Sequence, residues 1–222
     1  MFIFKKIETF FQRQPKRILT ESGIVYILNE NEKTAVLEKD TTSEGDIIIP
    51  RSIIYKSEEY IVTNILENAF NSSININSIQ FPEDSEIKSI GEGAFFFSSI
   101  QSISIPPKLF EIPRFFLSSC YNLRIVDIPE NSELNRINGY SFSKSTITSL
   151  YIPPKAVLQP HWCSGTTQLN RVTISPKNDH YCEYEGQFIL GKCDENLDIY
   201  DSLVFAPRNI EIAIIPSFIK KI

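Results

Sequence analysis

The chain has 222 residues, 42% of them hydrophobic, with 16 Phe but only one Met and one Trp, which is typical of one large folded domain or one elongated array. Its formal net charge of −5, without a polybasic run, argues against nucleic acid or an anionic membrane surface as the partner. Its apolar runs stay well short of the ~18 residues needed to span a bilayer, so we expect no transmembrane segment.

Residues 1–22 are expected to form an N-terminal helix or a tail. Ile3, Ile7 and Phe10 lie at helical spacing. A short helix that covers the first coil of the fold is favoured, and a helix on a membrane surface, suggested by the basic residues around the apolar ones, is the alternative. A lysine pair interrupts the first apolar run, which argues against a secretory signal peptide.

Residues 23–65 are expected to form an N-terminal β cap. Short runs such as IVYIL and TAVLE are separated by polar turns, and another turn contains Gly45 before the run IIIP. This alternation of strand-like runs and turn formers favours hairpins. An open stack of repeats has an unpaired end, and we expect this cap to cover it.

Residues 66–175 contain a repeat with a steady period. The segments INSIQFP, IQSISIP, LRIVDIP, ITSLYIP and LNRVTIS share the pattern apolar-x-x-apolar-x-apolar, and four of them end in proline. They are 24, 23, 24 and 22 residues apart and begin at Ile76, Ile100, Leu123, Ile147 and Leu169. So steady a period indicates a solenoid in which each repeat forms one coil. Because proline has no N–H, it ends each strand at the same level.

Each coil has a second apolar segment that leads into an aromatic corner. ILENAF, IGEGAF, IPRFFL and INGYSF each place an apolar residue five positions before an aromatic residue or leucine. Gly91 and Asn138 follow the apolar residue, and we expect a left-handed backbone there because these residue types adopt it at low cost; Pro113, at the same place in another coil, cannot adopt it, so this turn type is not expected in every coil. The large apolar side chains of one coil contribute roughly 8–18 kcal/mol, less than the ordering of its backbone costs, so coils are stable only when stacked.

Residues 176–209 interrupt the period and are expected to form a hairpin-type spacer. CEYEGQFILGK and LDIYDSLVFAP are expected as two strands around the turn CDENLD. Residues 210–222 then restart the repeat and reach its second apolar segment. This leaves an exposed apolar edge, which we expect either further chain or another molecule to cover, with self-association as one route.

These features resemble the BspA-like leucine-rich repeats found in surface proteins of some bacteria and protists. The matching segments are IKSIGEGAFFFSSIQSISIP (87–106), NRINGYSFSKSTITSLYIP (135–153), the opening at 23–70 and the spacer at 174–192. The resemblance covers residues 23–222. It implies an elongated, horseshoe-like leucine-rich-repeat solenoid, mostly β, with short helical or 3-10 corners.

The resemblance leaves two functional hypotheses open. It implies a non-catalytic protein-interaction module of the adhesion or surface-antigen type, which binds a host or matrix protein through the exposed strand face at the cell surface. An intracellular scaffold or assembly subunit, which binds or polymerises through its open repeat edge, is the alternative. The chain suggests neither a clear signal peptide nor a membrane anchor, so a cytoplasmic location stays open as well.

The residue types that carry chemistry suggest no catalytic, cofactor or metal site. Neither His161 nor His180 has an orienting third group that would complete a nucleophilic site with a cysteine. The four cysteines lack C-x-x-C spacing, and the eight glycines form no phosphate-binding loop. Cys182 and Cys193 flank the spacer hairpin and are candidates for a disulfide, although free thiols are favoured. We therefore expect a non-enzymatic protein.

The predicted binding surface is the outward side of the repeat strands, whose side chains alternate between core and solvent. One outward column contains Gln80, Ser104, Asp127, Tyr151 and Thr173. The neighbouring column contains Ser78, Ser102, Ile125, Ser149 and Arg171. Strands ~4.8 Å apart would join these columns into one patch, and Tyr and Arg side chains, including Arg124, are types that anchor interfaces. Solvated polar filler is the alternative, because Ser, Gln and Thr suit that role.

Overall fold

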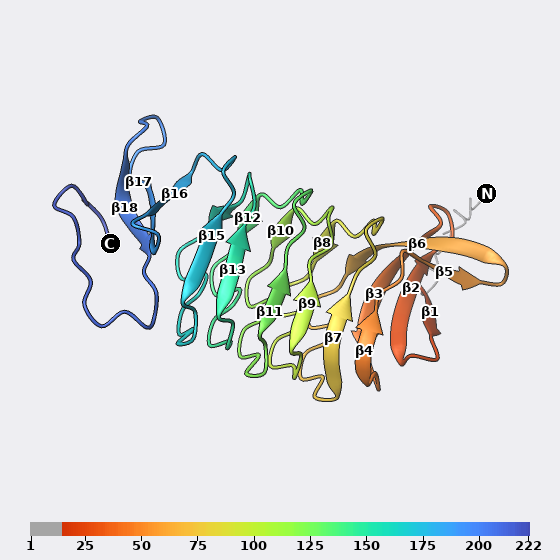
Figure 1. Ribbon diagram of the computed structural model, residues 1–222. Coiled ribbons are helices and arrows are strands. Elements are labelled where there is room, and N and C mark those ends of the chain that lie inside the picture. Colours follow the sequence, from red (N-terminus) through yellow and green to blue (C-terminus); the bar gives the residue numbers. More distant parts are fainter. Residues whose placement is uncertain (1–14) are drawn as a thin grey trace, which may run out of the picture.

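The computed structural model describes residues 15–222, and every regular element in this range is a β-strand (Figure 1). The strands wind into an elongated stack of coils with antiparallel hairpins at both ends. This arrangement confirms the predicted solenoid of stacked short strands. Of the predicted N-terminal helix or tail, residues 1–14 lie outside the described range, and Lys16–Leu19 form strand β1.

The N-terminal part is a mixed sheet in the order β1-β2-β3-β6-β5. Its strands are β1 (Lys16–Leu19), β2 (Ile24–Asn29), β3 (Thr34–Asp40), β5 (Ser52–Tyr55) and β6 (Glu58–Ile65). Strands β3 and β6 are parallel, whereas the other pairs along this path are antiparallel. Alternation in β2 buries Tyr26 on one face, whereas the other face carries the half-buried Val25 and Ile27 and the exposed Asn29. Through β6, which pairs with β8, the sheet joins the first coil.

The front of the stack is formed by one parallel strand from each coil. These strands are β4 (Gly45–Ile48), β7 (Ile76–Gln80), β9 (Ser102–Ser104), β11 (Ile125–Asp127), β13 (Ser149–Ile152) and β15 (Arg171–Ile174). The register places Ile79 beside Ile103 and Ile103 beside Val126, and places Leu150 beside Val172. All five side chains are buried, so the apolar positions line up from coil to coil as the repeat predicts.

A second row of short strands runs along the back of the stack. It contains β8 (Ser89–Ile90), β10 (Glu111–Ile112), β12 (Arg136–Ile137) and β14 (Val157–Leu158), and β10, β12 and β14 form one parallel sheet. The isoleucine or leucine of each strand is buried, whereas the preceding residue faces outward. This row is the second apolar segment of each repeat.

Each corner between the two rows is a pair of tight turns with two left-handed residues four positions apart. The first position has φ between 55° and 65° in Asn68, Gly93, Phe115, Tyr140 and His161. The second has φ between 57° and 73° in Ser72, Phe97, Ser119, Lys144 and Gly165. Backbone bonds tie each corner to the next; for example, the N–H of Phe95 donates to the carbonyl of Phe116 at 3.1 Å. The corners are therefore turns, instead of the expected short helical or 3-10 segments.

Gly91 is required for a reason other than the one expected. Neither Gly91 nor Asn138 has a positive φ, so the prediction for these two positions is wrong, and the left-handed residues follow two positions later. A Cβ on Gly91 would collide with the backbone nitrogen of Glu67 and would lie 2.7 Å from the carbonyl carbon of Leu66. The backbones of two coils approach so closely here that only glycine fits.

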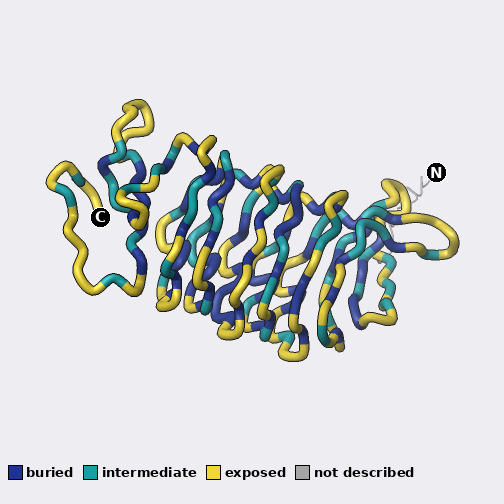
Figure 2. Tube along the Cα trace, in the orientation of Figure 1, coloured by how far each residue is buried: buried dark blue, intermediate teal, exposed yellow. Residues whose placement is uncertain are grey.

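The corner aromatics form the centre of the core. The ring of Phe95 stacks on Phe70 with centroids 5.0 Å apart, and it meets the edge of Phe116 at 5.3 Å. Farther along the stack, Phe142 meets Trp162 edge to face at 6.3 Å. Figure 2 shows buried segments recurring on every coil, because each coil buries its apolar side chains against its neighbours.

The C-terminal spacer is a three-stranded antiparallel sheet. Its strands are β16 (Tyr181–Tyr184), β17 (Phe188–Lys192) and β18 (Tyr200–Phe205). The segment expected as one strand, CEYEGQFILGK, is itself a hairpin, because Glu185 and Gly186 both have positive φ at its turn. Residues 210–222 lie beyond this sheet and are held to it by the Leu203 N–H, which donates to the carbonyl of Lys221 at 2.8 Å.

Candidate functional site

The predicted binding surface, called the strand face from here on, is the outward side of β7, β9, β11, β13 and β15. In its first column, Gln80 and Asp127 are exposed, whereas Ser104, Tyr151 and Thr173 are half-buried. The register places Ser104 beside Asp127 and places Tyr151 beside Thr173. Alternation along each strand is therefore as predicted, with core residues pointing inward and these residues pointing outward.

The second column of the strand face is less polar than its serines suggest. Ser102 lies between Ser78 and Ile125, and the Ile125 side chain is 59% exposed. Ser78 is buried, and its hydroxyl lies 2.7 Å from the carboxylate of Asp46, to which it donates. In the same column farther along, Ser149 pairs with Arg171, and both are exposed.

Strand β4 extends the strand face by one coil that sequence reasoning missed. Asp46 lies beside Ser78, and Ile48, which is exposed, lies beside Gln80. The available signal was the run IIIP at 47–50, which ends in proline as the repeat strands do. We expected that run only as part of the N-terminal cap, because it lacks the first apolar residue of the repeat pattern.

Within residues 15–222, the ladder of the strand face is interrupted between β11 and β13, so its hydrogen-bonded sheets contain four and two strands. At this junction the Thr146 hydroxyl lies 2.8 Å from the carbonyl oxygens of both Tyr121 and Leu123. A side-chain hydroxyl thus links the two coils at this junction. The strands remain neighbours, as Figure 1 shows, but the two halves of the face are not one continuous ladder.

Three charged side chains of the strand face form no ion pair with any residue from 15 to 222. Arg124, Asp127 and Arg171 are exposed, and none of the ion pairs formed within the described part of the chain includes them. Both signs of charge are present. Unpaired charges on a binding surface can be matched by a partner of complementary potential, which favours orientation and rapid association.

Four of the predicted site residues line two separate grooves. A groove of about 420 Å³ at the proline ends of the strands contains Ser104 and Asp127, beside Phe81 and Pro129. A second groove, of about 320 Å³, lies at the last strand of the face; it contains Arg171 and Thr173 and is bordered by the spacer residues Glu183, Gly186 and Gln187. Tyr151 lies between the two groups and packs partly against the core. The structure therefore brings together two pairs of predicted residues, one at each groove.

The remaining reactive residue types are dispersed. All four cysteines are free, with Cys182 opposite Leu190 in the hairpin, and burial raises the pKa of the Cys120 thiol to about 11. Between residues 15 and 222, no group of three or more His, Cys, Asp or Glu side chains is placed to hold a metal ion. The same part of the chain contains no helix long and apolar enough to cross a bilayer.

A family model described as the BspA type leucine-rich repeat region matches residues 51–170 in six copies. This range covers β5 to β14 and therefore most of the coils. No curated protein matches the chain.

Several solved structures share the fold. The pneumococcal vaccine antigen PcpA has a TM-score of 0.67 at 20% identity, over 89% of this chain and 58% of PcpA. A leucine-rich repeat protein from Bacteroides ovatus has a TM-score of 0.59 at 23% identity, over 70% of this chain and 40% of that protein. The T. pallidum leucine-rich repeat protein also scores 0.59, at 17% identity and 69% coverage of both chains. The chain thus spans less than two thirds of PcpA and of the B. ovatus protein, and identities this low indicate a shared fold alone.

Proposed function

Because the chain belongs to the BspA-type leucine-rich repeat family, we propose that it is a non-catalytic module that binds another protein through its strand face. The observation that carries the proposal is the set of exposed, unpaired charges on a rigid surface of stacked strands. The backbones at Asp127 and Arg171 are held in register by the coils beneath them, and Arg124 lies just before β11, so the points from which these side chains extend are set before a partner arrives. A preorganised surface loses little conformational entropy on binding.

The grooves give the strand face the shape of a binding site. The lining of the larger one combines three acidic residues with apolar walls, of which Phe81 is one. The acidic residues are Glu83, Asp127 and Glu130. A charged group beside apolar walls can pair with a partner's charge while water is excluded around it, which is the arrangement of interface hot spots. Adhesion or surface-antigen function is the form of this role that we favour, because PcpA, which shares the fold, is a vaccine antigen.

Affinity capture with matched variants tests the strand face. The immobilised chain, its Asp127→Ala/Tyr151→Ala variant and a Lys155→Ala/Gln168→Ala control, which changes two exposed residues outside the strands, are exposed to an extract of the source organism and to its host's surface proteins. We expect the control to retain the captured protein and the strand-face variant to bind it at least about tenfold more weakly. Equal affinity of all three proteins would remove the strand face as the site.

A separate measurement tests the adhesion role. Labelling of intact source cells with a reagent that does not cross membranes should modify this protein if it is displayed at the surface. Recovery of labelled protein supports the surface-antigen role. Labelling that occurs only after the cells are lysed contradicts that role while leaving the interaction module in place.

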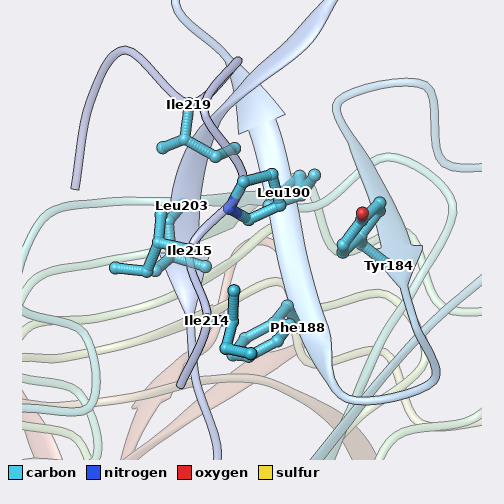
Figure 3. A pocket seen from close by; sticks show the side chains of 8 residues that line it. Tyr184, Phe188, Leu190, Leu203, Ile214, Ile215 and Ile219 are labelled. Carbon is cyan, nitrogen blue, oxygen red and sulfur yellow. The ribbon is translucent and has the colours of Figure 1, made fainter.

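Self-association through the C-terminal edge is a second candidate function, favoured by one specific observation. Ile212 and Ile214 are 81% and 82% exposed, although they belong to a segment with the repeat pattern. Figure 3 shows Ile214, Ile215 and Ile219 beside Phe188 and Leu190 of the spacer, which line a narrow apolar groove. Apolar side chains of a repeat coil are normally covered by the next coil, so this edge fits a further coil, a second copy or an assembly partner.

Light scattering coupled to size exclusion tests the edge. We expect the apparent mass of the wild-type chain to rise with concentration and that of Ile212→Asp/Ile214→Asp to stay at the 25.5 kDa of the monomer. Ile54→Asp, at an isoleucine of the N-terminal sheet that is 68% exposed, is the control and should behave as the wild type does. A wild-type mass that stays monomeric at every concentration contradicts self-association.

A further inference from the structure

A column of aromatic rings runs along the corners of the stack and ends at a glycine. At the first left-handed position of successive coils, Phe115 stacks on Tyr140 with centroids 5.6 Å apart, and Tyr140 stacks on His161 at 5.4 Å. The interplanar angles are 13° and 12°, so the three rings form one nearly parallel stack. In the coil that precedes Phe115 the equivalent residue is Gly93, and in the coil before that it is Asn68, so neither supplies a ring.

The missing ring leaves a groove. It has a volume of about 410 Å³, and its lining consists of Glu67, Asn68, Asn71, Glu92, Gly93, Phe96 and Phe115. Phe115 is covered on one face by Tyr140 and borders the groove on the other, and its side chain is partly exposed. The groove therefore offers a stacking surface to one flat group, in the position that a fourth ring of the column would occupy.

The polar groups of the groove are mainly hydrogen-bond acceptors. The side-chain oxygen of Asn68 accepts from Asn71 at 3.2 Å and lies 2.8 Å from the place that a Cβ on Gly93 would take. Glu67 and Glu92 are exposed, and neither takes part in an ion pair with any other residue in the 15–222 range. A ligand that suits these groups is rich in donors and carries positive charge.

The stack already holds one group of this chemistry. The guanidinium carbon of Arg114 lies 5.3 Å from the ring centroid of Phe115 and 6.0 Å from that of Tyr140. With two carboxylates against this one guanidinium, the groove is left with a net negative charge. A guanidinium is planar, stacks on aromatic faces and has five donors without an acceptor, so it matches the shape, the charge and the acceptors together.

We propose that the groove at Gly93 binds an arginine side chain of a protein partner, stacked on Phe115 and paired with Glu92 or Glu67. This site lies on the corners and is separate from the strand face, so it enlarges the proposed interaction role by a second contact of defined chemistry. The two sites fail independently, because Asp127→Ala/Tyr151→Ala leaves every residue of the groove unchanged.

Three blocked tripeptides test the chemistry on the full chain. Acetyl-Gly-Arg-Gly-amide, its lysine analogue and its citrulline analogue are titrated into isotope-labelled protein, and binding is followed by NMR. Lysine keeps the charge without the plane, and citrulline keeps the plane without the charge. We expect the arginine peptide to shift the signals of Gly93, Phe96 and Phe115 and to bind about tenfold more tightly than the other two.

Variants locate the site. Gly93→Phe supplies the missing ring and should abolish binding; its backbone is compatible, since Phe115 and Tyr140 adopt nearly the same φ as Gly93. Glu92→Gln, which keeps the shape, should weaken binding roughly three- to tenfold, and His161→Leu, at the far end of the stack, should leave it unchanged. Equal binding of the three peptides, no binding of the arginine peptide, or binding that survives both Gly93→Phe and Glu92→Gln would overturn the proposal.

Discussion

The corner core makes a quantitative prediction at Phe95. This side chain is fully buried, stacks on Phe70 at 5.0 Å and meets the edge of Phe116 at 5.3 Å, so its truncation opens a cavity between two coils. A Phe→Ala change in a core costs about 3–5 kcal/mol, and each lost aromatic pair accounts for about 0.5–1.5 kcal/mol beyond area burial. We therefore expect Phe95→Ala to lower the free energy of unfolding by an amount near the upper end of that range.

Phe97→Ala is the matched control for this prediction. Phe97 lies two residues farther along the same corner and is 49% exposed, and its ring pairs with those of Phe96 and Tyr121, at 6.3 and 5.8 Å. Its removal should cost about 1 kcal/mol. Urea unfolding followed by circular dichroism measures both changes. Similar small losses of unfolding free energy for the two variants would refute the idea that the buried rings of Phe70, Phe95 and Phe116 hold adjacent coils together.

Two further predictions concern coil spacing and the C-terminal segment. Gly91→Ala should lower the free energy of unfolding by about 3 kcal/mol, because its Cβ meets the backbone of Glu67. Gly186→Ala is the control: its Cβ has open space but its φ is +68°, so it should lower that free energy by about 1 kcal/mol. Equal losses for the two variants in urea unfolding would contradict the close approach of the coils at Gly91. The Lys220 ammonium and then the Cys193 N–H lower the pKa of Asp201 to about 2. The stability that Asp201 contributes is therefore present at neutral pH and lost as the pH falls from about 4 toward 2. Asp201→Asn should make Tm depend less on pH in this range. An unchanged pH dependence of Tm would contradict the ion pair between Asp201 and Lys220.

The repeat strands and their register are predictable because one rule is repeated. Ile79, Ile103 and Val126 occupy the same position in segments of constant period, and stacking of identical coils then leaves one arrangement in which all of them are buried. The outward columns follow from the same alternation. Strand β4 was missed because its segment shares only the final apolar residues and the proline.

The corners are less predictable because local preference is overridden there. Phe115 and Tyr140 hold positive φ, which residue preferences reserve for glycine and asparagine, since backbone bonds to the next coil and the stacked rings stabilise that conformation. The groove at Gly93 could not be predicted from the sequence, because it depends on the stacking of Phe115 and Tyr140 in the following coils. The interruption between β11 and β13 and the bond of the Thr146 hydroxyl to Leu123 of the neighbouring coil likewise have no counterpart in the repeat pattern.

Disulfide mapping of the strand face tests the central claim, that coils stack in register with these columns outward. The background has Cys182 and Cys193 replaced by serine. In it, Ser102→Cys/Ile125→Cys places two cysteines at directly paired positions of neighbouring strands. Their Cα atoms are about 4.8 Å apart, within the range that a disulfide bridges. Ser102→Cys/Asp127→Cys places them on the diagonal, about 7–8 Å apart. The account predicts that mild oxidation links the first pair and leaves the second as free thiols by mass spectrometry. Equal linkage of both pairs, or linkage of the diagonal pair alone, contradicts it.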